Sequence, residues 1–116
     1  MSRHDDTVYI RHMLDHARTA VELASARNRS SLDAEPMFRY ALLHLVSILG
    51  EAAARVSEAG RSRYAEVAWR DIVGMRNMLI HGYDVVDLDV LWQTIEDDIP
   101  ALIRKLESVL EKRGGS

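Results

Sequence analysis

Residues 40–49 form an apolar run that covers almost every side of a helix, and this run limits the possible folds more than any other feature. Only His44 and Ser47 interrupt it. A helix that is apolar all round must be buried on all its faces. A chain of 116 residues can build one hydrophobic core but not two, and one small domain rarely covers every face of such a helix. Part of the run is therefore expected to contact a second copy of the chain, which predicts a homodimer.

Apolar residues recur at helical spacing through most of the chain, which predicts an all-α fold. Four helices are expected, at about residues 6–28, 34–59, 66–81 and 88–110. Because the links between them are short, neighbouring helices should run in opposite directions. The predicted architecture is an antiparallel four-helix bundle, with residues 1–116 forming a single helical domain.

Residues that cap or interrupt helices set the expected boundaries. Asp5 or Asp6 should cap the first helix, and Gly60 should end the second. Gly74 weakens the third helix by up to ~1 kcal/mol relative to alanine, and close approach of another backbone would explain its presence. Pro100 removes one hydrogen bond and crowds the preceding turn, so the last helix should bend near it.

The composition excludes several classes of site and location. The chain has no cysteine, so it can form neither a disulfide nor a thiolate metal site. His12 and His16 are four residues apart, a spacing that suits a metal, but no third ligand is evident beside them and a solvated face is favoured. No cofactor or metal is therefore expected. No uninterrupted apolar stretch is long enough for a membrane span and no signal peptide is evident, so a cytoplasmic protein without membrane contact is expected.

Charge is distributed unevenly along the chain, although the net charge is only −3. Residues 55–76 carry five arginines and three acidic residues, an excess of two positive charges. Residues 84–111 carry eight acidic residues and two basic ones, an excess of six negative charges. Any contact with RNA should therefore involve the end of the molecule that carries Arg76, with the acidic helix facing elsewhere.

A polar motif stands at the predicted end of the third helix, where Arg76 and Asn77 are followed by His81, Gly82 and Tyr83. Glycine just after a helix allows the backbone to turn left-handed without a Cβ penalty. An arginine binds phosphate through a planar set of donors, and a histidine transfers protons near neutral pH. These side chains suit phosphodiester chemistry on RNA.

The same region resembles the HepT-like ribonucleases of the HEPN superfamily. The resemblance covers roughly residues 5–111 and is carried by segments 69–77 (WRDIVGMRN), 79–83 (LIHGY) and 50–53 (GEAA), with Asp87 and Trp92. The Arg-x4-His-x-Tyr signature of that family is complete here. The resemblance implies a HEPN-like bundle and a metal-independent endoribonuclease, the toxin of a toxin–antitoxin pair. It also implies a dimer and a nucleotidyltransferase antitoxin that silences the toxin by transferring AMP to Tyr83.

Chemistry assigns different roles to the motif residues. RNA is cut without a metal when its 2′-hydroxyl attacks the adjacent phosphorus, and His81 would serve as base or acid while Arg76 stabilises the charge on the phosphoryl oxygens. One histidine does not readily perform both proton transfers, so a dimer that brings two copies of the motif into one cleft is expected. On a regular helix residues 76 and 81 point about 140° apart, so Arg76 must reach round or the last turn must distort. Asn77 lies four residues before His81 and would share its face, as a supporting residue that orients the imidazole.

Other readings of the same residues stay open. Arg76 could instead pair with Asp71 or Asp84, His81 could cap the helix, and Tyr83 could be a packing residue. His44 is expected in the core or at an interface. A second hypothesis is a catalytically inactive helical dimer that serves as a binding module for a nucleotidyltransferase partner or a nucleotide. A purely structural bundle would leave the polar motif unexplained.

Overall fold

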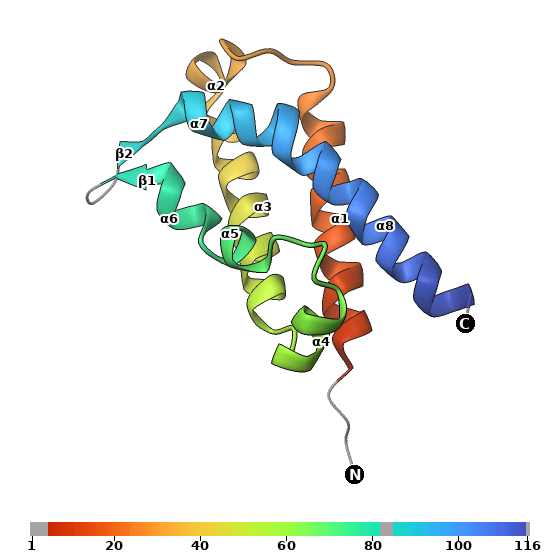
Figure 1. Ribbon diagram of the computed structural model, residues 1–116. Helices are drawn as coiled ribbons and strands as arrows, with labels where there is room; N and C mark the ends of the chain where they lie inside the picture. The colour runs from red at the N-terminus through yellow and green to blue at the C-terminus, as the bar shows by residue number, and fades with distance from the viewer. Residues whose placement is uncertain (1–4, 82–84, 116) are drawn as a thin grey trace.

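The computed structural model describes residues 5–81 and 85–115, with the side chains of residues 80, 81 and 113–115 outside the description. Two long helices, α1 (Asp6–Ala24) and α3 (Pro36–Ala54), pack side by side in opposite directions, and α8 (Ile99–Gly115) lies along α1 (Figure 1). Helices α5 (Trp69–Val73) and α6 (Met75–Leu79) pack on α3. The predicted all-α, HEPN-like fold is confirmed.

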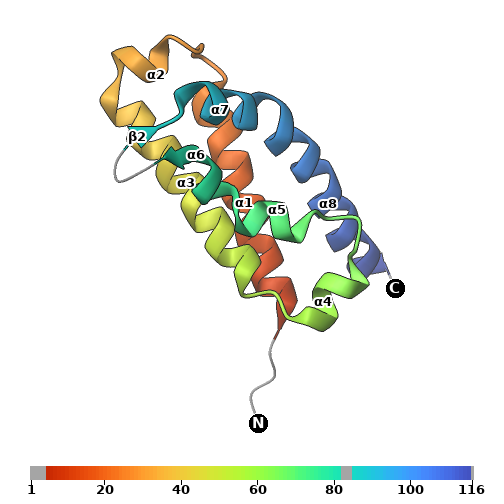
Figure 2. The ribbon, with the colours of Figure 1, turned by 60° about the vertical axis from the view of Figure 1, so that its left-hand side comes forward.

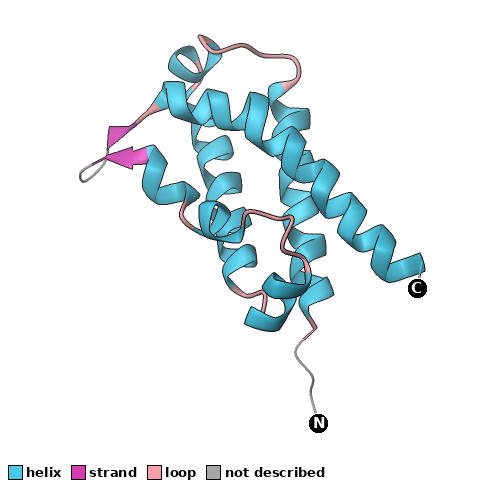
Figure 3. Ribbon diagram, viewed as in Figure 1, coloured by secondary structure: helices cyan, strands magenta, loops and turns pink. Residues whose placement is uncertain are grey.

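The remaining elements are short. Helix α2 (Ser31–Ala34) precedes α3, and α4 (Glu58–Arg63) lies at the opposite end of the molecule (Figure 2). Strands β1 (Ile80–His81) and β2 (Val85–Val86) form the hairpin seen in Figure 3. Helix α7 (Leu88–Gln93) continues through the π-helical turn η1 (Thr94–Asp98) into α8. In the described part of the chain the hairpin is the only sheet. Strand β1 occupies the end of the predicted third helix, and β2 lies in the link predicted between the third and the last helix.

One hydrophobic core joins these elements. Its fully buried larger side chains come from α1, from α3, from the continuous segment α7–η1–α8, and from α2 and α6. They are Ile10, Met13, Leu32, Leu42, Val46, Leu49, Leu79, Leu91, Ile99, Leu106 and Val109. The buried positions on α3 recur at intervals of three and four, which gives this helix one inward face. By length and composition α3 would also suffice to cross a membrane, and core helices share that property.

The predicted cap of the first helix and the predicted bend of the last helix agree with the structure. The Asp5 carboxylate accepts a hydrogen bond from the backbone N–H of Thr7, and Asp87 accepts one from that of Val90. Before Pro100 the helix widens, and the N–H of Ile99 bonds to the carbonyl of Thr94 five residues earlier. A proline has no N–H to continue the regular ladder, and a π turn is one way a helix accommodates this. Figure 1 shows the direction changing between α7 and α8.

Two predicted helix ends are wrong because side chains stop the helices earlier. Helix α1 ends at Ala24 rather than near residue 28, and the guanidinium of Arg27 bonds to the carbonyl oxygen of Leu23. The second helix ends at Ala54 rather than at Gly60, which lies inside α4. There Ser57 caps α4 through the N–H of Gly60 and donates both its own N–H and its hydroxyl to the Asp6 carboxylate.

Gly74 divides the predicted third helix into α5 and α6. A Cβ built on Gly74 would meet only the carbonyls of the preceding turn, with the oxygen of Arg70 at 3.3 Å. The expected close approach of another element occurs instead at Gly50 of α3, where a Cβ would lie 3.1 Å from the carbonyl oxygen of Ile72. The glycine that allows two backbones to meet is therefore Gly50, and Gly74 marks a break between two helices.

Candidate functional site

The motif begins on α6 and continues into the hairpin. Helix α6 ends at Leu79, whose carbonyl oxygen accepts a 2.7 Å hydrogen bond from the backbone N–H of Asp87. Ile80 then pairs with Val86, and His81 with Val85. The prediction that His81 closes a helix is wrong, because β-branched residues on both sides of a three-residue connection favour strand pairing. That pattern in the sequence could have identified the hairpin.

This change of backbone removes the helical-wheel relations between the motif residues. The 140° separation of Arg76 and His81 applies only to a regular helix, and the alternative in which the last turn distorts is the one found. The proposed shared face of Asn77 and His81 is wrong for the same reason. The role of Asn77 therefore stays a prediction without that geometric support.

Arg76 and Asn77 are exposed on α6. In the described part of the chain neither side chain makes a hydrogen bond or an ion pair. The pairing of Arg76 with Asp71 that the sequence left open is absent there. The guanidinium is thus available to a ligand, such as a phosphate group.

The remaining motif residues are not described by the structure, or are described only for the backbone. Gly82, Tyr83 and Asp84 are outside the described residues, as is the side chain of His81. The structure places the His81 backbone in β1, next to the helix that carries Arg76. The catalytic role of His81, the modification of Tyr83 and the pairing of Arg76 with Asp84 stay predictions.

Two of the segments that carry the family resemblance, 50–53 and 69–77, contain residues that hold α5 and α6 in place. Gly50 belongs to the first, and its lack of a side chain lets α3 touch the end of α5, so that α5 and α6 lie against α3. Trp69 begins the second, is buried, and donates its indole N–H to the carbonyl of Tyr64 at 3.0 Å. Both residues hold the short helices on which Arg76 stands.

Large apolar side chains are exposed on the elements around the motif. Met78 of α6 is 63% exposed and Val85 of β2 is 62% exposed, while Met37 and Tyr40 of α3 are 82% and 61% exposed. Within the run at residues 40–49, Tyr40 and His44 are exposed, and the other side chains are buried or partly buried. The expected second copy stays a prediction, and these side chains are the ones it would cover.

Three histidines lie near one another on α1 and α3. The His12 and His16 rings are 6.4 Å apart. Burial lowers the pKa of His16, and the neighbouring His12 and His44 lower it further against an opposing effect of Asp15. His44 is exposed, so the expectation of a core histidine is wrong and an interface position stays open. Among the described residues no group of three or more His, Asp or Glu side chains is arranged to hold a metal ion.

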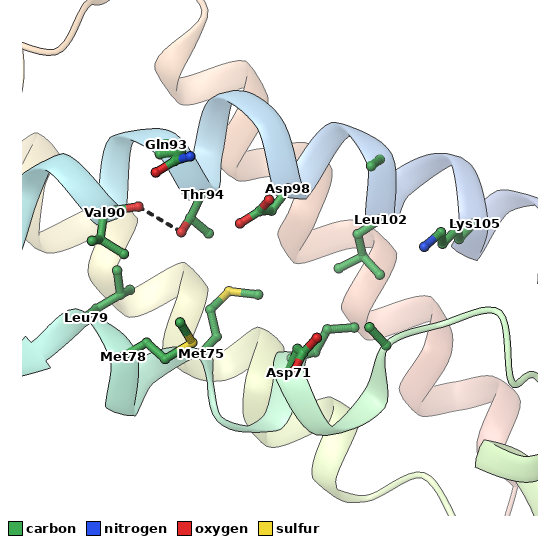
Figure 4. A pocket seen from close by; sticks show the side chains of 13 residues that line it. Asp71, Met75, Met78, Leu79, Val90, Gln93, Thr94, Asp98, Leu102 and Lys105 are labelled. Atoms are coloured by element: carbon green, nitrogen blue, oxygen red, sulfur yellow. Dashed lines mark hydrogen bonds between the residues drawn. The ribbon is translucent and has the colours of Figure 1, made fainter.

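The sequence did not predict a pocket of about 570 Å³ between α5–α6 and η1–α8 (Figure 4). Apolar side chains from α5, α6, α7 and α8 form most of its wall, and Asp71, Asp98 and Lys105 stand among the polar groups that line it. Neither Arg76 nor Asn77 lines this pocket. The residues were visible as helical apolar positions, but the space between two helices depends on how far apart they pack.

Comparison with known proteins gives matches along most of the chain. The sequence profile described as "Ribonuclease HepT-like" matches residues 13–109. A Methanocaldococcus jannaschii protein named as a putative RNase is 29% identical over 109 residues, which is 94% of this chain and 100% of that protein. A protein of Thermococcus cleftensis named as a probable ribonuclease HepT is 37% identical over 71 residues, which is 61% of this chain and 64% of that protein. No solved structure matches the chain.

Proposed function

The chain belongs to the HepT-like ribonuclease family, and from that premise we propose that it is a metal-independent endoribonuclease, the toxin of a toxin–antitoxin pair. One observation carries the proposal. The exposed Arg76, which has no partner among the described residues, stands on a five-residue helix that leads directly into the strand containing His81. An arginine and a histidine five residues apart in the sequence would supply phosphate binding and proton transfer.

The reaction follows from these two groups. The 2′-hydroxyl of RNA attacks the adjacent phosphorus, and His81 accepts the hydroxyl proton or donates a proton to the leaving 5′-oxygen. Arg76 binds the phosphoryl oxygens and stabilises the negative charge that grows on them in the transition state. The P–O5′ bond breaks and a 2′,3′-cyclic phosphate remains. No step requires a metal ion.

A second copy of the chain would supply the second proton-transfer group. In a two-fold dimer one shared cleft would hold both copies of Arg76 and His81, one histidine as base and the other as acid. The exposed apolar side chains on α3, α6 and β2 favour this arrangement, because they would be covered in such a dimer.

Control of the toxin would act on the same hairpin. A partner nucleotidyltransferase would transfer AMP from ATP to the phenol oxygen of Tyr83, two residues after His81 in the sequence, with release of pyrophosphate. The added phosphate would compete with the RNA backbone for Arg76, and the nucleoside would obstruct the cleft.

Cleavage of a labelled RNA in the presence of EDTA tests the enzyme directly. We expect products that end in a 2′,3′-cyclic phosphate, identified by mass spectrometry. If EDTA abolishes cleavage and Mg²⁺ restores it, the metal-independent mechanism is wrong. If the purified protein cuts no RNA but binds a nucleotidyltransferase, the alternative holds, in which the dimer is a catalytically inactive binding module.

A further inference from the structure

The pocket between α5–α6 and η1–α8 has the size of a small-molecule site. Its volume is about 570 Å³, and ligand pockets generally measure 300–1,000 Å³. Its wall is mainly apolar and is formed by Ala68, Ile72, Met75, Met78, Leu79, Val90, Ala101 and Leu102. Methionine side chains are flexible and adapt to ligands of different shapes.

Two carboxylates face this apolar space from opposite walls. Asp71 belongs to α5 and Asp98 to η1, and both are exposed side chains that line the pocket (Figure 4). Within the described part of the chain neither carboxylate has a hydrogen bond or an ion pair. The one basic residue of the lining, Lys105, also lies near Glu66 and helps lower the pKa of that carboxyl, after a backbone hydrogen bond and Lys112.

We propose that this pocket binds a small organic ammonium compound, a primary amine that carries an apolar chain or ring. The ammonium group would lie between Asp71 and Asp98, and the apolar part would contact the methionines. With Lys105 included, the three charged groups of the lining sum to one negative charge, which disfavours carboxylates, phosphates and nucleotides.

A ligand in this pocket would contact the back of the helix that carries the motif. Met75, Met78 and Leu79 of α6 line the pocket. Arg76 and Asn77 do not line the pocket; at 100° per residue Arg76 projects to the side of the face formed by these residues, and Asn77 to the opposite side of the helix. The ligand would therefore stabilise α6 without blocking Arg76. Binding is independent of RNA cleavage, whereas any effect on cleavage rests on the proposed function.

Hexylamine, hexanol and hexanoate test the proposal, because they share one apolar chain and differ in the charge of the head group. We expect saturable binding of hexylamine in NMR titrations of methionine methyl groups. The signals of Met75 and Met78 should move, whereas that of Met37, which does not line the pocket, should not. Hexanol should bind about fivefold more weakly, and hexanoate more weakly still.

Variants of Asp71 and Asp98 distinguish binding of the amine in the pocket from its attraction to acidic side chains elsewhere on the protein. The double variant Asp71→Asn, Asp98→Asn should bind hexylamine no better than hexanol. The matched control is Asp97→Asn, an exposed acid on η1 that does not line the pocket, and its hexylamine affinity should equal that of the wild type. Equal binding of hexylamine and hexanol, or an equal loss in the control, would overturn the proposal. So would the absence of any shift at Met75 and Met78. These outcomes leave the ribonuclease assay unaffected, so failure here is distinguishable from failure of the proposed function.

Discussion

Several arginines of this chain hold the fold together, and Arg76 differs from them. Arg29 bonds to Asp33 at 2.8 Å and to Asp89 at 2.7 Å, which joins the segment before α2 to the start of α7. Arg61 donates to carbonyls at the end of α3. Arg76 makes no comparable contact with a described residue. A side chain without a structural contact can be replaced at little cost in stability, so any large loss on replacement must come from function.

Replacement of Arg76 by alanine should therefore affect cleavage and leave the fold intact. We expect RNA cleavage to fall by about 10²–10³-fold, because a single transition-state donor contributes this much in other enzymes. The helical CD spectrum and the melting temperature should stay close to those of the wild type. The matched control is Arg70→Ala, an exposed arginine on α5, which should cleave normally. Equal activity of the two variants would remove Arg76 from the catalytic site.

Replacement of Tyr83 by phenylalanine isolates the role of the hydroxyl. The variant should cleave RNA at the wild-type rate, because the phenol has no part in the reaction. When it is co-expressed with the nucleotidyltransferase, it should stay active and carry no AMP, as measured by mass spectrometry of the peptide that contains residue 83. A wild-type protein that is fully silenced but unmodified at Tyr83 would indicate inhibition by docking alone.

At the scale of elements, the contact between α3 and α5 is sensitive to the addition of a single atom. Gly50→Ala would place a Cβ 3.1 Å from the carbonyl oxygen of Ile72, and the two helices must move apart. We expect a loss of about 1–3 kcal/mol in the free energy of unfolding, measured by urea denaturation. Glu51→Ala, at the next and exposed position of α3, should change stability little. An unchanged stability of Gly50→Ala would show that α5 is held by other contacts.

The elements that the sequence predicts well are those fixed by local patterns. Asp5 and Asp87 are recognisable as caps because they precede apolar helical repeats. Pro100 predicts a bend because proline cannot donate the regular helical hydrogen bond. The end of the second helix was missed for a different reason. Asp6 binds Ser57 from 51 residues away, and that contact between distant segments separates α3 from α4. No local pattern reports such a contact.

The candidate site divides in the same way. Arg76 and His81 are identified by their spacing and by the family resemblance, and neither depends on the helix continuing. Their geometry does depend on it, because the pairing of Val85 and Val86 with residues 80 and 81 converts the helix end into a strand. The pocket between α5–α6 and η1–α8 depends on the distance between packed helices, which the sequence pattern does not predict. Residue types therefore suggest the chemistry of the site, which stays a prediction, whereas the shape of the site depends on packing that residue types do not specify.

At the scale of the whole molecule, the elements that surround the motif expose apolar side chains. Helix α6 packs on α3, so Arg76 lies close to the helix whose outer side carries Met37, Tyr40 and His44. A monomer would leave these apolar groups in water, at a cost of about 25 cal/mol for each Å² that a dimer could cover. The proposed cleft and the proposed interface would therefore form together, and loss of the dimer should also remove activity.

Tyr40→Glu tests this link, since it places a charge on the outer side of α3 without entering the core. Tyr40 is 61% exposed, so the monomer should keep its fold and its helical CD spectrum. Burial of an unpaired carboxylate in an interface is strongly unfavourable, and we expect the dimer dissociation constant to rise at least about tenfold, measured by sedimentation equilibrium. RNA cleavage should fall in parallel and recover at high protein concentration.

Val8→Glu is the control, because Val8 is an exposed apolar residue of α1, 45% accessible and distant in sequence from the motif. It should leave both dimer and activity unchanged. A monomeric wild type at micromolar concentration would refute the homodimer, and a monomeric Tyr40→Glu that cleaves at the full rate would show that one chain contains the whole catalytic site.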